Sequence, residues 1–139
     1  MRLDTTTEFG ARVERRLRED LIIWLVTVGP DETPQPSPVW SLWDTGTLLI
    51  YSRPDTPKLR NIRSRPKVAL HLDGNGQGGD IVILTGEARL VTDAPPADQV
   101  PAYVEKYRKG IARIGMTPES FARAYSVAIR VTPRKVRGH

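Results

Sequence analysis

The spacing of hydrophobic and polar positions changes several times along this chain, and each change marks an element. Phe9, Val13 and Leu17 recur every four residues among charged side chains, which predicts an amphipathic helix over about residues 7–20. The next run, Leu21–Val28, is apolar and rich in β-branched residues, which is typical of a buried strand. Five further strands are predicted, at residues 36–43, 48–52, 67–72, 80–91 and 126–131.

Turn residues place the connections between these strands. Asp44-Thr45-Gly46 predicts a hairpin turn. The glycine-rich segment 73–79 predicts another hairpin connection rather than a calcium loop, because acidic ligands are missing at alternate positions. Gly86, inside a long predicted strand, indicates a β-bulge.

Capping residues predict three more helices. Thr56 and Pro57 suit the N-cap and first position of a short helix over residues 58–63. Two later helices are predicted, at 102–109, where Gly110 ends the helix, and from Thr117-Pro118 to about residue 125. Six short strands with helices between and around them predict an α+β, mostly β fold: a small antiparallel barrel with peripheral helices.

The predicted strand 36–43 has prolines that cannot donate to a ladder, so it should lie at a sheet edge or at a break in pairing. Ser37, Val39 and Ser41 point to one face, and Trp40 and Leu42 point to the other. The first face could offer small side chains and free backbone amides to a flat heterocycle. The alternative is an edge strand with Trp40 in the core.

Composition narrows the class of protein. The 139 residues fit one domain that spans residues 1–139. Cysteine is absent, which excludes disulfides and thiolate metal sites, and no apolar run approaches the roughly 20 residues of a membrane span. The N-terminus lacks the pattern of a signal peptide, so we expect a soluble, cytoplasmic protein. The net charge of +5 favours anionic partners in general.

The start of the predicted helix near Lys58 is the strongest candidate for a binding site. A helix N-terminus presents free N–H groups and the positive end of the helix dipole, which suits an anion. Arg53, Lys58 and Arg60 surround this start. A phosphate or carboxylate could be held by Lys58, Asn61 on the same helix face, and Ser52 at the preceding strand end. The alternative is a solvated basic helix.

The order of these motifs resembles the pyridoxamine 5′-phosphate oxidase-like split-barrel family. The matching segments, in chain order, are P-S-P-V-W, the D-T-G turn, L-L-I-Y-S, K-L-R-N-I-R, P-K-V-A-L-H-L and the closing I-R-V-T-P-R-K-V-R. Within this family the chain is most similar to the deazaflavin-dependent oxidoreductases that use coenzyme F420. The resemblance implies a six-stranded antiparallel split β-barrel that forms a homodimer, with two cofactor sites between the protomers.

The resemblance also implies which residues meet the cofactor. A flavin or deazaflavin ring would lie along Ser37, Pro38, Val39 and Trp40, and the phosphate would meet Tyr51, Ser52, Lys58, Arg60 and Asn61. The partner protomer would close each site with the region His71–Gly79. Pyridoxamine phosphate oxidases carry an Arg-Lys pair after the third strand, whereas Arg53 and Lys58 are separated here. This difference favours coenzyme F420 over FMN and argues against pyridoxamine oxidation.

The predicted protein is therefore an oxidoreductase that transfers a hydride from reduced coenzyme F420 to a small organic substrate. The cofactor carries the chemistry, so no catalytic residue is predicted, although Tyr51 or a bound water could supply a proton. The alternatives are an FMN-dependent oxidoreductase of the same fold, and a non-catalytic cofactor or tetrapyrrole module in which His71 would ligate haem. A nucleic-acid binder ranks last because no reading helix or aromatic basic sheet face is present. No metal, membrane or nucleic-acid partner is expected.

Overall fold

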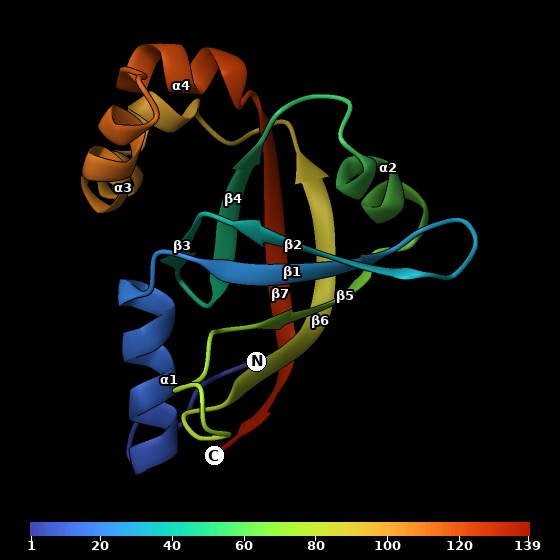
Figure 1. The fold of residues 1–139 in the computed structure, drawn as a ribbon, viewed down its shortest axis with the longest axis vertical. Coiled ribbons are helices and arrows are strands. Elements are labelled where there is room, and N and C mark those ends of the chain that lie inside the picture. The colour runs from blue at the N-terminus through green and yellow to red at the C-terminus, as the bar shows by residue number, and fades with distance from the viewer.

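The computed structural model describes residues 1–139 and shows one curled antiparallel sheet surrounded by four α-helices (Figure 1). The strands are β1 (Ile23–Val28), β2 (Pro34–Val39), β3 (Ser41–Asp44), β4 (Thr47–Ser52), β5 (Lys67–His71), β6 (Val82–Val91) and β7 (Val127–Gly138). The helices are α1 (Glu8–Glu19), α2 (Pro57–Ser64), the 3₁₀ turn η1 (Ala97–Gln99), α3 (Pro101–Arg113) and α4 (Pro118–Ala124). The predicted α+β, mostly β class is confirmed. No helix is both long and apolar enough to cross a membrane.

The sheet has seven strands in the order β2-β1-β5-β6-β7-β4-β3, so the predicted count of six is wrong. The predicted strand 36–43 is divided at Trp40 into β2 and β3, which pair with different neighbours. β2 pairs with β1 at one edge of the sheet, and β3 pairs with β4 at the other edge. Because the chain passes directly between the two edges at Trp40, the sheet must curl until these edges meet. Figure 1 shows the result, with β1 and β2 crossing in front of β4 and β7.

The prolines of β2 explain why this strand lies at an edge, as predicted. The N–H of Gly29 donates to the carbonyl of Thr33 at 3.1 Å, and alternation along the ladder from this pair turns the N–H groups of Ser37 and Val39 toward β1. The outer edge then carries the residues that have no N–H group, Pro34, Pro36 and Pro38. The amides of Ser37 and Val39 are therefore directed into the sheet, and the expectation that they are free for a heterocycle is wrong.

A bulge lets β7 run further than predicted. We expected this strand to end at Val131, but it continues along β6 to Gly138. Pro133 pairs opposite Gly86, where the register shifts as the glycine predicted. Pro133 has no N–H group, so it fits this irregular position. A Cβ on Gly86 would overlap the carbonyl oxygen of Thr132 and would lie 2.8 Å from the Cα of Pro133, so the bulge requires glycine.

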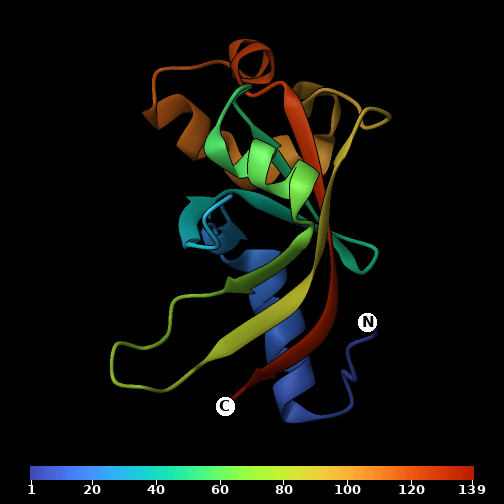
Figure 2. The ribbon, with the colours of Figure 1, turned by 90° about the vertical axis from the view of Figure 1, so that its right-hand side faces the viewer.

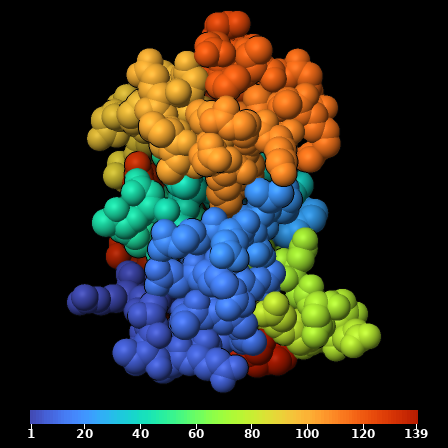
Figure 3. Space-filling view, turned by 90° about the vertical axis from the view of Figure 1, so that its left-hand side faces the viewer, coloured from blue at the N-terminus to red at the C-terminus, as the bar shows by residue number.

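The strand β4 is buried on both faces and separates two apolar cores. Leu48 and Ile50 point into the curled sheet, where they join the larger core. Leu49 and Tyr51 point outward into a second core, which also contains buried residues of α3 and α4. Figure 3 shows these two helices, in orange, as a layer above α1 and the strands. The second core therefore fixes the helices α3 and α4 against the outside of the barrel.

The helix α3 passes through Gly110, so the predicted end at this residue is wrong. A Cβ on Gly110 would lie 3.0 Å from the ring of Trp40, which means that the glycine allows a close approach of helix and indole. The chain leaves the helix at Gly115, whose φ of +77° is typical of a helix C-terminus. The N–H of Gly115 donates to Ala112, and the N–H of Met116 donates to Ile111.

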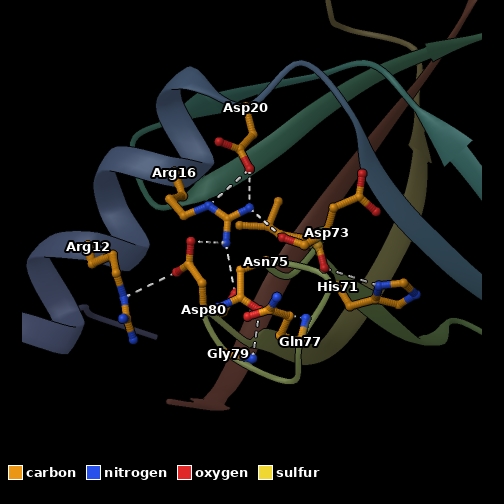
Figure 4. Close-up of polar contacts among 10 residues, drawn as sticks. Arg12, Arg16, Asp20, His71, Asp73, Asn75, Gln77, Gly79 and Asp80 are labelled. Atoms are coloured by element: carbon orange, nitrogen blue, oxygen red, sulfur yellow. Dashed lines mark hydrogen bonds and ion pairs between the residues drawn. The ribbon is translucent and has the colours of Figure 1, made fainter.

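The glycine-rich loop 73–79 connects β5 to β6, as predicted, and projects from the sheet (Figure 2). Arg16 of α1 holds both ends of this loop (Figure 4). Its guanidinium donates to the carbonyl of Asp73 at 2.6 Å and to the carbonyl of Asp80 at 2.9 Å, and it pairs with the carboxylate of Asp20 at 2.6 Å. The loop is thereby attached to α1 rather than to the helices α3 and α4.

Candidate functional site

A cavity of about 280 Å³ lies between the β2–β3 junction, the end of β4, the start of α2 and the helices α3 and α4. These elements lie in the upper half of Figure 1. Its lining residues are Pro38, Val39, Trp40, Tyr51, Ser52, Arg53, Thr56, Lys58, Tyr103, Ile114, Phe121 and Tyr125. Four separate segments of the chain therefore build one cavity.

The polar part of the cavity lies where β4 leads into α2. Thr56 has the extended backbone of an N-cap residue (φ −82°, ψ 153°), and Pro57 follows at the start of the helix, as predicted. The Thr56 hydroxyl does not cap the helix, because it hydrogen-bonds to the Ser52 hydroxyl at 3.2 Å. The N–H at the second helical position, that of Lys58, therefore has no side-chain acceptor and is available to an anion.

Another part of the cavity is a wall of stacked aromatic rings. The indole of Trp40 lies flat against Tyr107, with 4.8 Å between ring centroids and 4° between ring planes. It also stacks on Phe121 at 5.6 Å, and Phe121 stacks on Tyr125 at 4.3 Å. Trp40, Phe121 and Tyr125 of this stack line the cavity and give this part of it an apolar, aromatic surface.

The β2–β3 junction is held in place by Tyr107 and Lys106. The Tyr107 hydroxyl accepts a hydrogen bond from the N–H of Ser41 at 2.7 Å. It donates one to the carbonyl of Leu21 at 2.8 Å. The ammonium of Lys106 donates to the carbonyl of Ser41 at 2.7 Å, and burial lowers the pKa of Lys106 to about 8.

None of the backbone hydrogen bonds outside the helices and strands involves Trp40, so the N–H of this junction residue is unpaired.

The charges in the cavity are all positive. Arg53 and Lys58 line it, and none of the lining residues is acidic. The guanidinium of Arg53 lies 4.7 Å from the ring centroid of Tyr125, and neither Arg53 nor Lys58 forms an ion pair. Burial lowers the pKa of Lys58, because desolvation disfavours the ammonium. An anion would relieve that cost, so the cavity favours a negatively charged ligand.

The cavity contains six of the nine residues that the sequence pointed to: Pro38, Val39, Trp40, Tyr51, Ser52 and Lys58. The other three, Ser37, Arg60 and Asn61, do not line it. The Ser37 hydroxyl is buried without a partner, and Arg60 donates to the carbonyl of Asp55 at 2.9 Å on the surface. That the six bind a cofactor stays a prediction.

Asn61 is buried, and its amide supports the fold rather than the cavity. Its Nδ2 donates to Thr27 Oγ1 and to Gln35 Oε1, both at 3.0 Å. The side chain thus ties α2 to β1 and β2. This contradicts the expectation that Asn61 and Lys58 grip one anion together.

Replacing Asn61 with alanine should lower the free energy of unfolding by about 1–3 kcal/mol, because two partners lose their buried donor. Urea unfolding measures this loss. The control is Arg60→Ala at the neighbouring exposed position, which should change stability by less than about 0.5 kcal/mol. Full stability in Asn61→Ala together with a loss of anion binding would return Asn61 to the site.

The ring of His71 and the hydroxyl of Tyr51, two other predicted candidates, have partners within the fold. His71 on β5 stacks on Trp24, with 6.1 Å between centroids and 8° between planes, and it does not line the cavity. The Tyr51 hydroxyl donates to the carbonyl of Pro95 at 2.6 Å, and burial raises the pKa of Tyr51. Tyr51 is therefore a poor source of a proton for a ligand. No group of three or more His, Cys, Asp or Glu side chains could hold a metal ion.

Sequence reasoning missed half of the lining. It placed Arg53 beside the helix start but did not include it in the site, and it also left out Thr56, Tyr103, Ile114, Phe121 and Tyr125. The last four come from α3, α4 and their flanking residues. One available signal was the spacing of aromatic residues, since Tyr103 and Tyr107, and Phe121 and Tyr125, are each four residues apart.

Comparison with known proteins places the chain among flavin-type split barrels. The family model described as pyridoxamine 5′-phosphate oxidase matches residues 9–139. No curated protein matches the chain.

Three solved structures illustrate the range of proteins with this fold. An F420 reductase is 25% identical, with a TM-score of 0.66 over 89% of this chain and 94% of that chain. An FAD-binding protein from Mesorhizobium loti is 19% identical, with a TM-score of 0.65 over 88% of each chain. HutZ, the haem storage protein from Vibrio cholerae, is 13% identical, with a TM-score of 0.64 over 99% of this chain and 95% of that chain. The last two likenesses show the fold alone.

Proposed function

This chain belongs to the pyridoxamine 5′-phosphate oxidase family, and from that premise we propose that it is an oxidoreductase that uses coenzyme F420. In this proposal the cofactor binds in the aromatic cavity, and the enzyme transfers a hydride from the reduced cofactor to a small organic substrate. The observation that carries the proposal is the combination of two unpaired cations, Arg53 and Lys58, with a wall of stacked rings. The likeness to an F420 reductase supports the same assignment.

The residues present fit such a ligand. Arg53, Lys58 and the free N–H of Lys58 suit a phosphodiester, and the unpaired N–H of Trp40 suits an acceptor atom of a heterocycle. A bound deazaflavin would supply the carbon that accepts or donates the hydride. The protein would bind the anionic part, hold the ring beside residues 38–40, and exclude water with the helices α3 and α4.

FMN is the second candidate, because it combines a flat ring with a phosphate and would meet the same residues. The fold is also found in an FAD-binding protein. A haem-binding module is less well supported, although a haem storage protein shares the fold, because no histidine lines the cavity and His71 stacks on Trp24.

We further propose that the chain is a homodimer. Trp24, Val26 and Ala69 are partly exposed on the outer face of β1 and β5, where they form an apolar surface with no covering element. A second copy packed on this surface would bury it and would bring the loop 73–79 to another protomer. Light scattering of the purified protein tests this state directly.

Titration of the purified protein with coenzyme F420 and, separately, with FMN tests the proposed function. Trp40 is part of the cavity wall, so a ring bound nearby should quench tryptophan fluorescence. The variant Trp40→Phe shows how much of the signal comes from this residue rather than from Trp24 or Trp43. We expect tighter binding of F420 than of FMN. The reverse order would assign the chain to the flavin branch, and binding of neither at about 50 μM, or about −6 kcal/mol, would refute both.

A further inference from the structure

Tyr103 lines the cavity, and its buried hydroxyl has no hydrogen-bond partner. The side chain is fully buried. Three aromatic rings surround it, those of Tyr51, Tyr107 and Phe121, with centroids 5.0, 5.0 and 6.1 Å away. A buried hydroxyl without a partner lowers stability, so its presence calls for an explanation.

The neighbouring tyrosines show that Tyr103 is an exception within this core. Tyr51 donates to the carbonyl of Pro95, and Tyr107 bonds to Ser41 and Leu21. Phenylalanine at position 103 would fill nearly the same space without burying an unpaired hydroxyl. Burial also raises the pKa of Tyr103, so the group stays a neutral O–H donor.

The two polar features of the cavity lie at different depths. Arg53 is exposed and Lys58 is half-buried, so the cations mark the mouth of the cavity. Tyr103 is fully buried and is the least exposed of the lining residues. A ligand that pairs with the cations and extends its ring inward would bring a ring atom toward this donor.

We propose that Tyr103 donates a hydrogen bond to the ligand, and that the cavity selects planar anionic ring compounds with a carbonyl oxygen or ring nitrogen at their inner end. The inference rests on the proposed function in taking this cavity as the ligand site, but it does not depend on which cofactor binds. It also explains why an unpaired hydroxyl is kept in a core that is otherwise satisfied or apolar.

The test compares ligands that differ by one acceptor atom. The probes are 2-naphthoate and a set of quinolinecarboxylates with the ring nitrogen at different positions, titrated into the wild type and Tyr103→Phe. In the wild type, the best quinolinecarboxylate should bind about 2- to 12-fold more tightly than 2-naphthoate, which is the range for one net hydrogen bond. In Tyr103→Phe this preference should disappear, while the affinity for 2-naphthoate should stay the same.

The unfolding of the free protein gives a second readout. Tyr103→Phe should leave the unfolding midpoint unchanged or raise it, because it removes an unpaired hydroxyl. The matched control Tyr107→Phe should lower the midpoint, because it leaves the N–H of Ser41 without its acceptor. An equal loss in both variants would mean that Tyr103 has a structural partner, and the proposal would fail.

The outcomes separate this inference from the proposed function. A wild-type preference that survives in Tyr103→Phe, or the lack of any preference or binding in the wild type, overturns the inference. A preference that is lost in Tyr103→Phe, in a protein that binds neither F420 nor FMN, supports the Tyr103 donor and rejects the proposed function.

Discussion

Replacing Gly86 with alanine should lower the free energy of unfolding by about 2–3 kcal/mol, which is the upper part of the range for overpacking. The added Cβ would overlap the backbone carbonyl of Thr132 and would lie 2.8 Å from the Cα of Pro133. Both obstacles are backbone atoms of β7, so no side-chain rotation removes the clash. Relief requires a shift of β7, and this strand pairs with both β6 and β4.

Urea or thermal unfolding measures this loss. The matched control is Thr85→Ala, an exposed position beside the same bulge, which should change stability by less than about 0.5 kcal/mol. If Gly86→Ala is as stable as this control, β7 can move at little cost, and the bulge does not depend on glycine.

The same bulge shows what a sequence can indicate locally. A glycine within a long apolar strand predicted the irregularity, and the D-T-G hairpin and the start of α2 followed from equally short signals. Each of these features depends on backbone geometry within a few residues. The extent of β7 was missed because a proline such as Pro133 usually ends a strand, and the sequence does not show that Gly86 lies opposite it and provides a bulge.

The division of the predicted strand 36–43 could not be found in this way. Both halves have extended backbone, and no local signal shows that β2 pairs with β1 while β3 pairs with β4. The prediction that Gly110 ends a helix was wrong for a related reason. The glycine looked like a helix end, but its role is to let Trp40, distant in sequence, approach α3.

The candidate site likewise contains residues that one short segment predicts and residues that only the packing of distant segments brings in. Ser52 and Lys58 lie beside one helix start, so a short segment was enough to place them together. Tyr103, Phe121 and Tyr125 reach the cavity only because the second core packs α3 and α4 against β4. That packing depends on contacts across more than half the chain, which periodicity within one element cannot show.

Replacing Lys58 with alanine should weaken the binding of coenzyme F420 by about 1–3 kcal/mol, the scale of a lost charge-assisted hydrogen bond. The side chain lines the cavity without an acidic partner, so its loss leaves no compensating rearrangement of an ion pair. Tryptophan fluorescence titration measures the change. Arg60→Ala is the matched control, because it removes the same charge from the same helix but outside the cavity, and it should leave the affinity nearly unchanged.

The dependence of this affinity on pH separates a direct contact from a general effect of charge. Burial lowers the pKa of Lys58 below the ordinary lysine value of 10.5, so its ammonium loses a proton at a lower pH than that of an exposed lysine. Binding of an anion needs the ammonium, so wild-type affinity should fall as pH rises toward 10.5. Lys58→Ala should lack this fall, whereas Arg60→Ala should retain it. Equal pH profiles in all three proteins, or unchanged affinity in Lys58→Ala, would remove Lys58 from the site and leave Arg53 as the only cation for the ligand.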